Sequence, residues 1–163
     1  MSKNEHLMFV CTGNTCRSPM AEAIFKQLLQ ETDCTWTVSS AGTHAVEGGV
    51  AAWEARETMV GLGIDIVEHR SRQLSEEMLK KAGVVLTMTG AHKQLILSEF
   101  PDAADRVFTV KEFSGIGRNP DIGDPFGQGI KIYREVAQEL QKHLTLVLEK
   151  LREGQYCNGN RGK

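Results

Sequence analysis

Short apolar runs alternate along the chain with longer segments in which apolar residues recur every three or four positions. A short apolar run bounded by turn residues is typical of a strand buried in a parallel sheet. Four such runs predict four strands, at Leu7–Val10, Thr35–Ser40, Val84–Met88 and Arg106–Val110.

The segments between these runs have the 3.6-residue period of amphipathic helices. Ser18 is suited to be an N-cap and Pro19 to the first helical turn. The first predicted helix begins at Pro19. The others cover about Gly49–Leu62, Ser75–Ala82, Ala91–Phe100 and Ile130–Leu151. The segment Ser114–Gly129 is rich in Gly, Pro, Asn and Asp, and so long a loop in a compact domain is usually functional.

Strands alternating with helices predict a three-layer α/β/α sandwich around a central four-stranded parallel sheet. The 163 residues suit one domain over 1–163, in which the polar tail 154–163 is expected to be frayed. Ligands of such sheets bind at the carboxyl ends of the strands. The loops Cys11–Ser18 and Ser114–Gly129 are therefore the places to look for a site.

Composition narrows the function classes. With 40% apolar and 25% charged residues the chain can bury a core, which excludes disorder. The 19 Lys and Arg against 21 Asp and Glu give a net charge of −2, so we expect neither a nucleic acid nor a membrane as partner, and any anion must be bound locally. Without a membrane-length apolar stretch or a signal-peptide pattern, the expected location is cytoplasmic, where the four cysteines would be thiols.

The loop Cys11–Ser18 has the parts of an anion site. Gly13 and Asn14 are the residue types that most readily take a positive φ, which lets successive backbone N–H groups turn inward. The following helix adds its free N–H groups and positive dipole end, and Arg17 adds a planar fork suited to two phosphate oxygens. Together they predict a cradle for one tetrahedral dianion.

Cys11 lies where its sulfur would face the centre of that cradle. The surrounding positive groups favour the thiolate, which is a nucleophile, and the Ser18 hydroxyl could donate to it. The alternative is a buried core thiol beside an ordinary helix cap. Cys11 and Cys16 lack the tight spacing of a metal site and no Walker loop is present, so neither metal nor cofactor is expected.

The stretch Val10–Pro19 resembles the phosphate-binding loop of the low-molecular-weight protein tyrosine phosphatases. The likeness covers about residues 6 to 152 and includes the Ser40-Ala41-Gly42 turn and the Asp124-Pro125 pair. It implies that Cys11 is the nucleophile, Arg17 holds the phosphoryl group and Asp124 is the general acid. The expected phosphate- or substrate-binding residues are Thr12, Gly13, Asn14, Thr15, Cys16, Arg17, Ser18 and Phe126.

Residue chemistry alone does not single out Asp124. A leaving group needs a proton donor opposite the thiolate, and the long loop offers both Asp121 and Asp124. An Asp before Pro is commonly a turn residue. Only the resemblance selects Asp124 between them.

Thr15 bears on the substrate. The tyrosine phosphatases of this family usually carry an apolar residue there, whereas a hydroxyl resembles the branch that removes phosphate from arginine in proteins. Thr15 could orient Asp124 or the attacking water, or could merely fill space. The single aromatic Phe126 could stack on a guanidinium or pack on the surface.

Three further points stay open. Cys16 could form a protective disulfide with Cys11 or could be a structural thiol beneath the loop. The histidines at positions 44, 69 and 92 are taken as structural or solvated. Arsenate reductases also resemble this loop, but they use two further mid-chain cysteines, and residues 70–100 contain none.

A catalytically silent phosphate-binding module is disfavoured, because both Cys11 and Asp124 are present. The sequence therefore predicts a cofactor-free, monomeric phosphatase that works through a phosphocysteine on arginine-phosphorylated proteins. Tyrosine-phosphorylated proteins are the alternative substrate.

Overall fold

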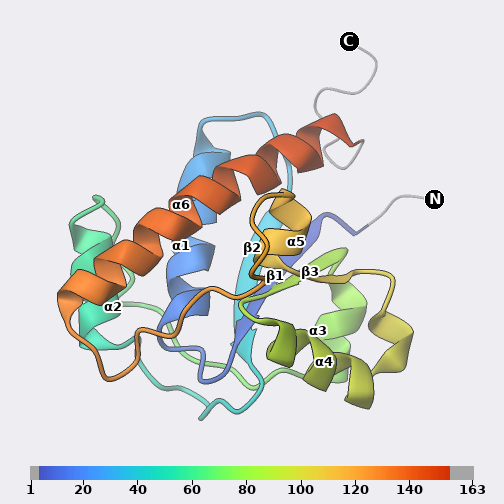
Figure 1. The fold of residues 1–163 in the computed structure, drawn as a ribbon, viewed down its shortest axis with the longest axis horizontal. Coiled ribbons are helices and arrows are strands. Elements are labelled where there is room, and N and C mark those ends of the chain that lie inside the picture. Colours follow the sequence, from blue (N-terminus) through green and yellow to red (C-terminus); the bar gives the residue numbers. More distant parts are fainter. Residues whose placement is uncertain (1–3, 155–163) are drawn as a thin grey trace.

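A parallel sheet of four strands forms the centre of the molecule (Figure 1). The computed structural model describes residues 4–154. The strands are β1 (His6–Cys11), β2 (Thr37–Gly42), β3 (Val84–Thr87) and β4 (Val107–Thr109), in the order β2-β1-β3-β4. All three pairings are parallel, so the predicted sheet is confirmed.

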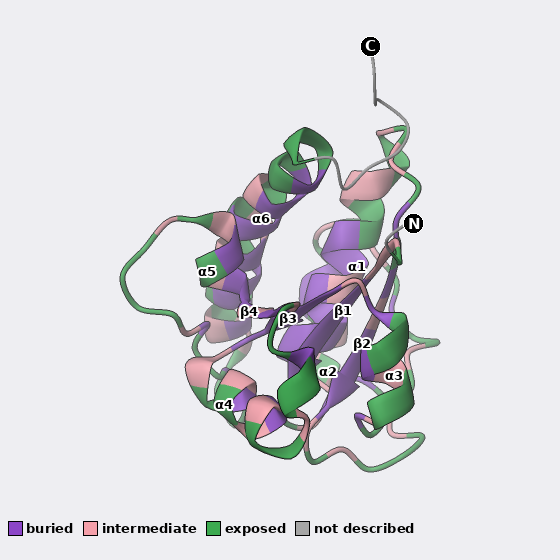
Figure 2. Ribbon diagram, turned by 90° about the vertical axis from the view of Figure 1, so that its right-hand side faces the viewer, coloured by how far each residue is buried: buried purple, intermediate pink, exposed green. Residues whose placement is uncertain are grey.

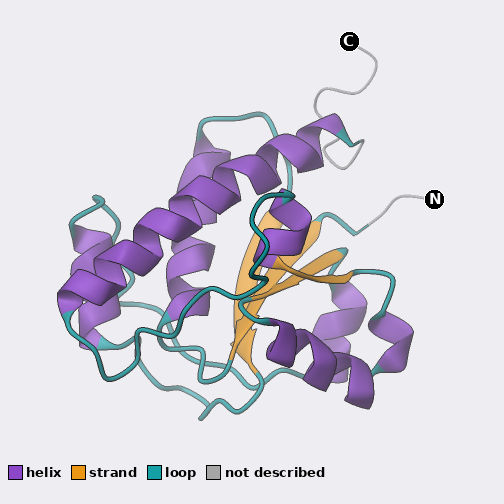
Figure 3. Cartoon of the chain, viewed as in Figure 1, coloured by secondary structure: helices purple, strands orange, loops and turns teal. Residues whose placement is uncertain are grey.

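Helices connect the strands and cover both faces of the sheet (Figure 3). They are α1 (Arg17–Gln30), α2 (Trp53–Val60), α3 (Glu76–Lys81), α4 (Gly90–Glu99), the 3₁₀ helix η1 (Pro101–Ala103), α5 (Val110–Ser114) and α6 (Ile130–Glu153). The long α6 crosses in front of α1 on one side of the sheet, whereas α3 and α4 lie on the other (Figure 1).

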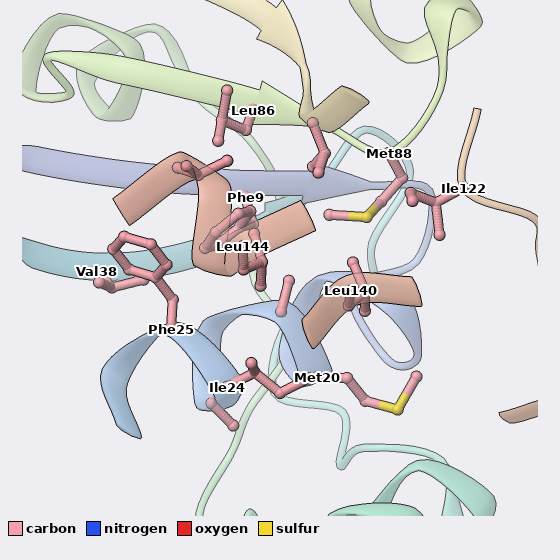
Figure 4. Packing of buried hydrophobic residues seen from close by; sticks show 14 of the residues in the cluster. Phe9, Met20, Ile24, Phe25, Val38, Leu86, Met88, Ile122, Leu140 and Leu144 are labelled. Carbon is pink, nitrogen blue, oxygen red and sulfur yellow. The ribbon is translucent and has the colours of Figure 1, made fainter. Parts of the chain in front are cut away.

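Alternate residues of β1 supply two separate cores. Phe9 faces the larger core, where it meets Phe25 edge to face with ring centroids 6.0 Å apart and packs with Leu144 of α6 (Figure 4). Met8 faces the smaller core with Leu79 of α3. Figure 2 shows the buried strands between exposed outer helix faces. This period-two division of one strand produces the predicted three-layer sandwich.

The predicted helix over Gly49–Leu62 is too long at its start. The observed α2 begins only at Trp53, because Ala52 has extended backbone angles, φ −56° and ψ 145°. The N–H of Ala52 donates to the Thr15 carbonyl over 2.9 Å, and the N–H of Gly49 donates to the Ser71 hydroxyl. The Ala52 N–H, which the prediction gave to a helix, thus holds the Cys11–Ser18 loop instead.

Other predicted boundaries differ as well, and β2 covers Thr37–Gly42 instead of Thr35–Ser40. Val110, predicted to end a strand, begins α5, whose start is fixed by a capping box between Thr109 and Glu112. Helix α1 begins at Arg17, so Ser18 lies inside the helix and is not its N-cap. Apart from residue 154, the predicted tail 154–163 lies outside the described residues.

The carboxyl ends of β1 and β3 bring distant loops together. The Met88 N–H donates to the Val10 carbonyl over 2.9 Å, and the Ile122 N–H donates to the Met88 carbonyl over 2.8 Å. Gly42, at the end of β2, has no room for a side chain, since a Cβ there would lie 2.4 Å from the Thr12 carbonyl oxygen. Between residues 4 and 154, no helix is long and apolar enough to cross a membrane.

Candidate active site

Cys11 ends β1 at the centre of the loop that leads into α1. Its side chain is buried, and its Sγ lies 2.9 Å from the Ser18 Oγ. The Asn14 backbone has φ 58°, as the sequence predicted, and turns the chain there. Gly13 does not have a positive φ, so that part of the prediction is wrong. The single left-handed residue gives the loop its turn.

The direction of the hydrogen bonds around the thiol can be worked out. The Arg72 N–H donates to the Asn14 Oδ1 over 3.0 Å, which fixes the amide so that its Nδ2 is the donor on the other side. That Nδ2 donates to the hydroxyls of Ser18, over 2.8 Å, and Ser40, over 2.9 Å. Because the Ser18 oxygen accepts from Asn14, its hydrogen is available for Cys11. A donor at this position favours the thiolate form.

The same asparagine is held from two further sides. His69 Nε2 donates to the Asn14 carbonyl over 2.8 Å. The Ser40 hydroxyl, which accepts from Asn14, donates to the Glu22 carboxylate over 2.6 Å. This network fixes the conformation of the loop.

Arg17 is already oriented toward the site. Its guanidinium is 5% exposed, donates from Nη1 to the Ile122 carbonyl over 2.8 Å, and has Nη2 3.6 Å from the Asp124 Oδ2. A buried guanidinium held by two partners has little rotamer freedom to lose when it binds an anion.

The two candidate acids have different surroundings. Asp121 accepts the Gly90 N–H at the start of α4 over 2.8 Å, which ties it to a structural contact. Asp124 is 55% exposed, accepts the Phe126 N–H over 3.0 Å, and lines the same cavity as Cys11. Geometry therefore favours Asp124, which the residue chemistry alone did not distinguish.

The cavity above Cys11 has a volume of about 230 Å³. Phe126 stands at its edge with 73% of its surface exposed, and it shares the lining with Thr15. The Thr15 hydroxyl lies 3.7 Å from the Cys16 Sγ, while no Thr15–Asp124 hydrogen bond occurs within residues 4–154. The lining residues are Cys11, Thr12, Gly13, Thr15, Cys16, Arg17, Asp124 and Phe126.

Cys16 is the second cysteine of the loop. Its side chain is 5% exposed and its Sγ contacts the Tyr133 hydroxyl at 3.2 Å. Burial raises the pKa of the Cys16 thiol and also that of the Tyr133 phenol, so both keep their protons. Cys11 and Cys16 are both free thiols here, and a protective disulfide between them stays a prediction.

Two histidines that the sequence predicts to be structural or solvated belong to the site. His69 holds Asn14, and His92 Nε2 lies 2.9 Å from the Thr12 hydroxyl. Neither has a local motif. The only available signal was position, because His92 follows β3, whose carboxyl end lies beside that of β1.

One correction concerns a cysteine outside the Cys11–Ser18 loop. Cys34 is disulfide-bonded, so the expectation of a thiol is wrong at that position, since a cysteine count does not show which sulfurs meet in the fold. Among the side chains that the structure describes, no three His, Cys, Asp or Glu residues converge as a metal site would require.

A family model connects this geometry with known proteins. The model described as low molecular weight phosphotyrosine protein phosphatase matches residues 6–156 of the chain. The sequence is 42% identical over 147 residues to a protein-arginine-phosphatase of Bacillus subtilis, covering 90% of this chain and 97% of that protein. It is 37% identical over 140 residues to the low molecular weight protein-tyrosine-phosphatase PtpB of Staphylococcus haemolyticus, covering 82% and 91%.

A solved structure agrees with these matches. The fold is similar to that of a mutant YwlE arginine phosphatase with a phosphorylated active-site serine, with a TM-score of 0.87 and 41% identity, over 91% of this chain and 96% of the other.

Proposed function

The chain belongs to the low molecular weight phosphotyrosine protein phosphatase family, and on that basis we propose that it hydrolyses phosphoarginine in proteins. It is a cysteine-dependent phosphatase, and its substrates are phosphorylated proteins. Among phosphorylated residues, the proposed substrate is phosphoarginine and not phosphotyrosine.

One observation carries that choice. The wall of the cavity presents the hydroxyl-bearing side chain of Thr15 together with Asp124 and the single aromatic Phe126. A polar wall suits a guanidino group, which has several N–H donors, better than it suits an apolar phenol ring. The relatives named arginine phosphatases support the same substrate.

The first chemical step takes place at the loop N–H groups, Arg17 and Cys11. The phosphoryl oxygens accept from the N–H groups of the loop and from Arg17, and the Cys11 thiolate attacks phosphorus. A P–S bond forms as the P–N bond breaks, and the departing nitrogen takes a proton from the Asp124 carboxylic acid. The products are a phosphocysteine and an unmodified arginine side chain.

The second step returns the enzyme to its starting state. Asp124, now a carboxylate, takes a proton from water, and the water oxygen attacks phosphorus as the P–S bond breaks. The Ser18 hydroxyl, 2.9 Å from the sulfur, stabilises the thiolate as it departs. Inorganic phosphate leaves the loop.

The experiment measures phosphate released from an arginine-phosphorylated peptide. Cys11→Ser should abolish turnover, because it removes the nucleophile. Asp124→Asn should slow turnover by about a hundredfold or more, because the leaving nitrogen loses its proton donor.

Asp121→Asn is the matched control, because an asparagine oxygen can still accept the Gly90 N–H. It should retain most of the activity. Release of phosphate from phosphotyrosine but none from phosphoarginine would leave the chain a tyrosine phosphatase and reject the proposed substrate.

A monomeric state and a cytoplasmic location belong to the same proposal. Cys11, Arg17 and Asp124 line one cavity of a single chain, so the proposed chemistry does not require a residue from a second copy.

A further inference from the structure

His92 joins the start of a helix to the nucleophile loop. It lies in the first turn of α4, and its backbone N–H donates to the Thr89 hydroxyl, the N-cap of that helix, over 3.1 Å. The ring is 7% exposed, with Nδ1 3.0 Å from the Thr89 Oγ1 and Nε2 2.9 Å from the Thr12 Oγ1. Both ring nitrogens therefore have hydroxyl partners.

The ring is neutral near pH 7. Burial, reinforced by the positive charge of Arg17, lowers the pKa of His92 to about 4. In a neutral imidazole one nitrogen donates and the other accepts. The direction of each hydrogen bond then depends on which nitrogen carries the proton.

The helix cap decides between the two tautomers. The Thr89 oxygen already accepts the His92 backbone N–H, so its own hydrogen is free to go to Nδ1. Nε2 then carries the ring proton and donates it to the Thr12 oxygen. The opposite tautomer would leave the Thr89 hydrogen without its ring partner, which makes it the poorer arrangement.

We infer that His92 is a positioning residue for the phosphoryl site, which orients the Thr12 hydroxyl so that its hydrogen is donated to a phosphoryl oxygen of the substrate. Thr12 lines the cavity above Cys11, and its oxygen accepts from Nε2, so the hydroxyl hydrogen is directed away from the ring. The inference rests on the proposed phosphatase activity but not on the choice between phosphoarginine and phosphotyrosine.

The surroundings of His92 suit this role, because the start of α4 also holds the acid loop. The Gly90 N–H donates to Asp121, and the Met88 carbonyl accepts from Ile122, whose own carbonyl holds Arg17. The segment that carries His92 is thus attached to both halves of the site. A displacement of the His92 ring would therefore change the geometry of the phosphoryl-binding site.

The test measures the affinity for inorganic phosphate by calorimetry and the kcat and KM for a phosphotyrosine peptide. In His92→Asn the amide overlies Nδ1 and keeps the Thr89 contact but does not reach Thr12, whereas in His92→Gln it reaches the position of Nε2. Phosphate binding should weaken about tenfold in His92→Asn and in Thr12→Val, the loss of one hydrogen bond to a charged group. His92→Gln and Thr12→Ser should stay within about twofold of the wild type, because each keeps the hydrogen-bonding group.

The double variant Thr12→Val/His92→Asn separates positioning from a merely structural role. If His92 acts through Thr12, the double variant binds phosphate no more weakly than Thr12→Val alone. Losses that multiply in the double variant would overturn the inference, and so would unchanged phosphate affinity in His92→Asn.

His143→Asn is the control for burial. His143 is also buried and bonded through Nδ1 to a hydroxyl, that of Ser114 at 2.7 Å, but it lies on α6 outside the cavity. It should leave phosphate affinity unchanged, even where it lowers thermal stability. Because the measurements use inorganic phosphate and phosphotyrosine, they can be interpreted even if phosphoarginine proves not to be a substrate.

Discussion

The hydrogen of the Ser18 hydroxyl is the smallest feature on which the chemistry depends. The Asn14 side-chain amide donates to the Ser18 oxygen, so the hydrogen of the Ser18 hydroxyl is directed to Cys11. Ser18→Ala should slow alkylation of Cys11 by iodoacetamide near neutral pH by about tenfold, because a hydrogen bond to the reactive anion is lost. The measurement is the rate of Cys11 modification followed by mass spectrometry.

Ser98→Ala is the control for that experiment, since the Ser98 hydroxyl is exposed, donates to the Leu95 carbonyl of its own helix and does not line the cavity. Its alkylation rate should match the wild type. Equal rates in Ser18→Ala and the wild type would mean that Ser18 does not stabilise the thiolate.

At the scale of single residues, the sequence predicted the chemistry of the Cys11–Ser18 loop better than the side chains that hold this loop in place. Cys11, Arg17 and Ser18 lie within eight residues, so their types and spacing already suggest an anion site. His69 and His92 reach the loop from residues far along the chain, and their contacts depend on tertiary packing. Two predictions were made for Ser18. Its contact with the thiol is present at 2.9 Å, whereas its role as helix cap is wrong, because cap preferences are local and α1 already begins at Arg17.

Helix α4 is the element with the clearest dependence on pH. Its His92 has a pKa of about 4 against 6.5 for the free side chain, so folding favours the neutral ring. Stability from this group is present above about pH 6.5 and is lost as the pH falls toward 4, by up to about 3 kcal/mol. The charged and titratable groups facing the ring are Arg17, Asp124, Asp121 and His44.

Urea unfolding at pH 7 and pH 4.5 measures this loss. His92→Gln lacks the titrating ring, so it should lose less stability between the two pH values than the wild type does. Carboxylates contribute equally in both proteins and cancel in the comparison. Parallel losses would show that His92 is not held neutral by the fold.

The elements themselves were predictable to different degrees. The four strands and the long α6 follow from strong apolar patterns. The predicted start of α2 is wrong. The Ala52 N–H donates to the Thr15 carbonyl and the Gly49 N–H donates to the Ser71 hydroxyl, so neither is available to a helix. Helix α5 was missed because its capping box lies within an apolar run that resembles a strand.

At the scale of the whole molecule, the sheet order explains why one site is built from distant segments. Placing β1 between β2 and β3 gathers the Cys11 loop, Gly42 and the start of α4 at one edge. The loop that carries Asp124 reaches the same edge through Ile122. The alternation of strands and helices predicted the class of this architecture, but the strand order and the contact of Asp124 with Arg17 required the fold.

The most direct test of the central claim compares kcat/KM on two peptides of matched sequence, one with phosphoarginine and one with phosphotyrosine. The account predicts that the wild type prefers phosphoarginine and that Thr15→Ile shifts the ratio toward phosphotyrosine by about tenfold or more, because an apolar side chain replaces a polar one in the cavity wall. A wild-type preference for phosphotyrosine, or a ratio unchanged by Thr15→Ile, would contradict it.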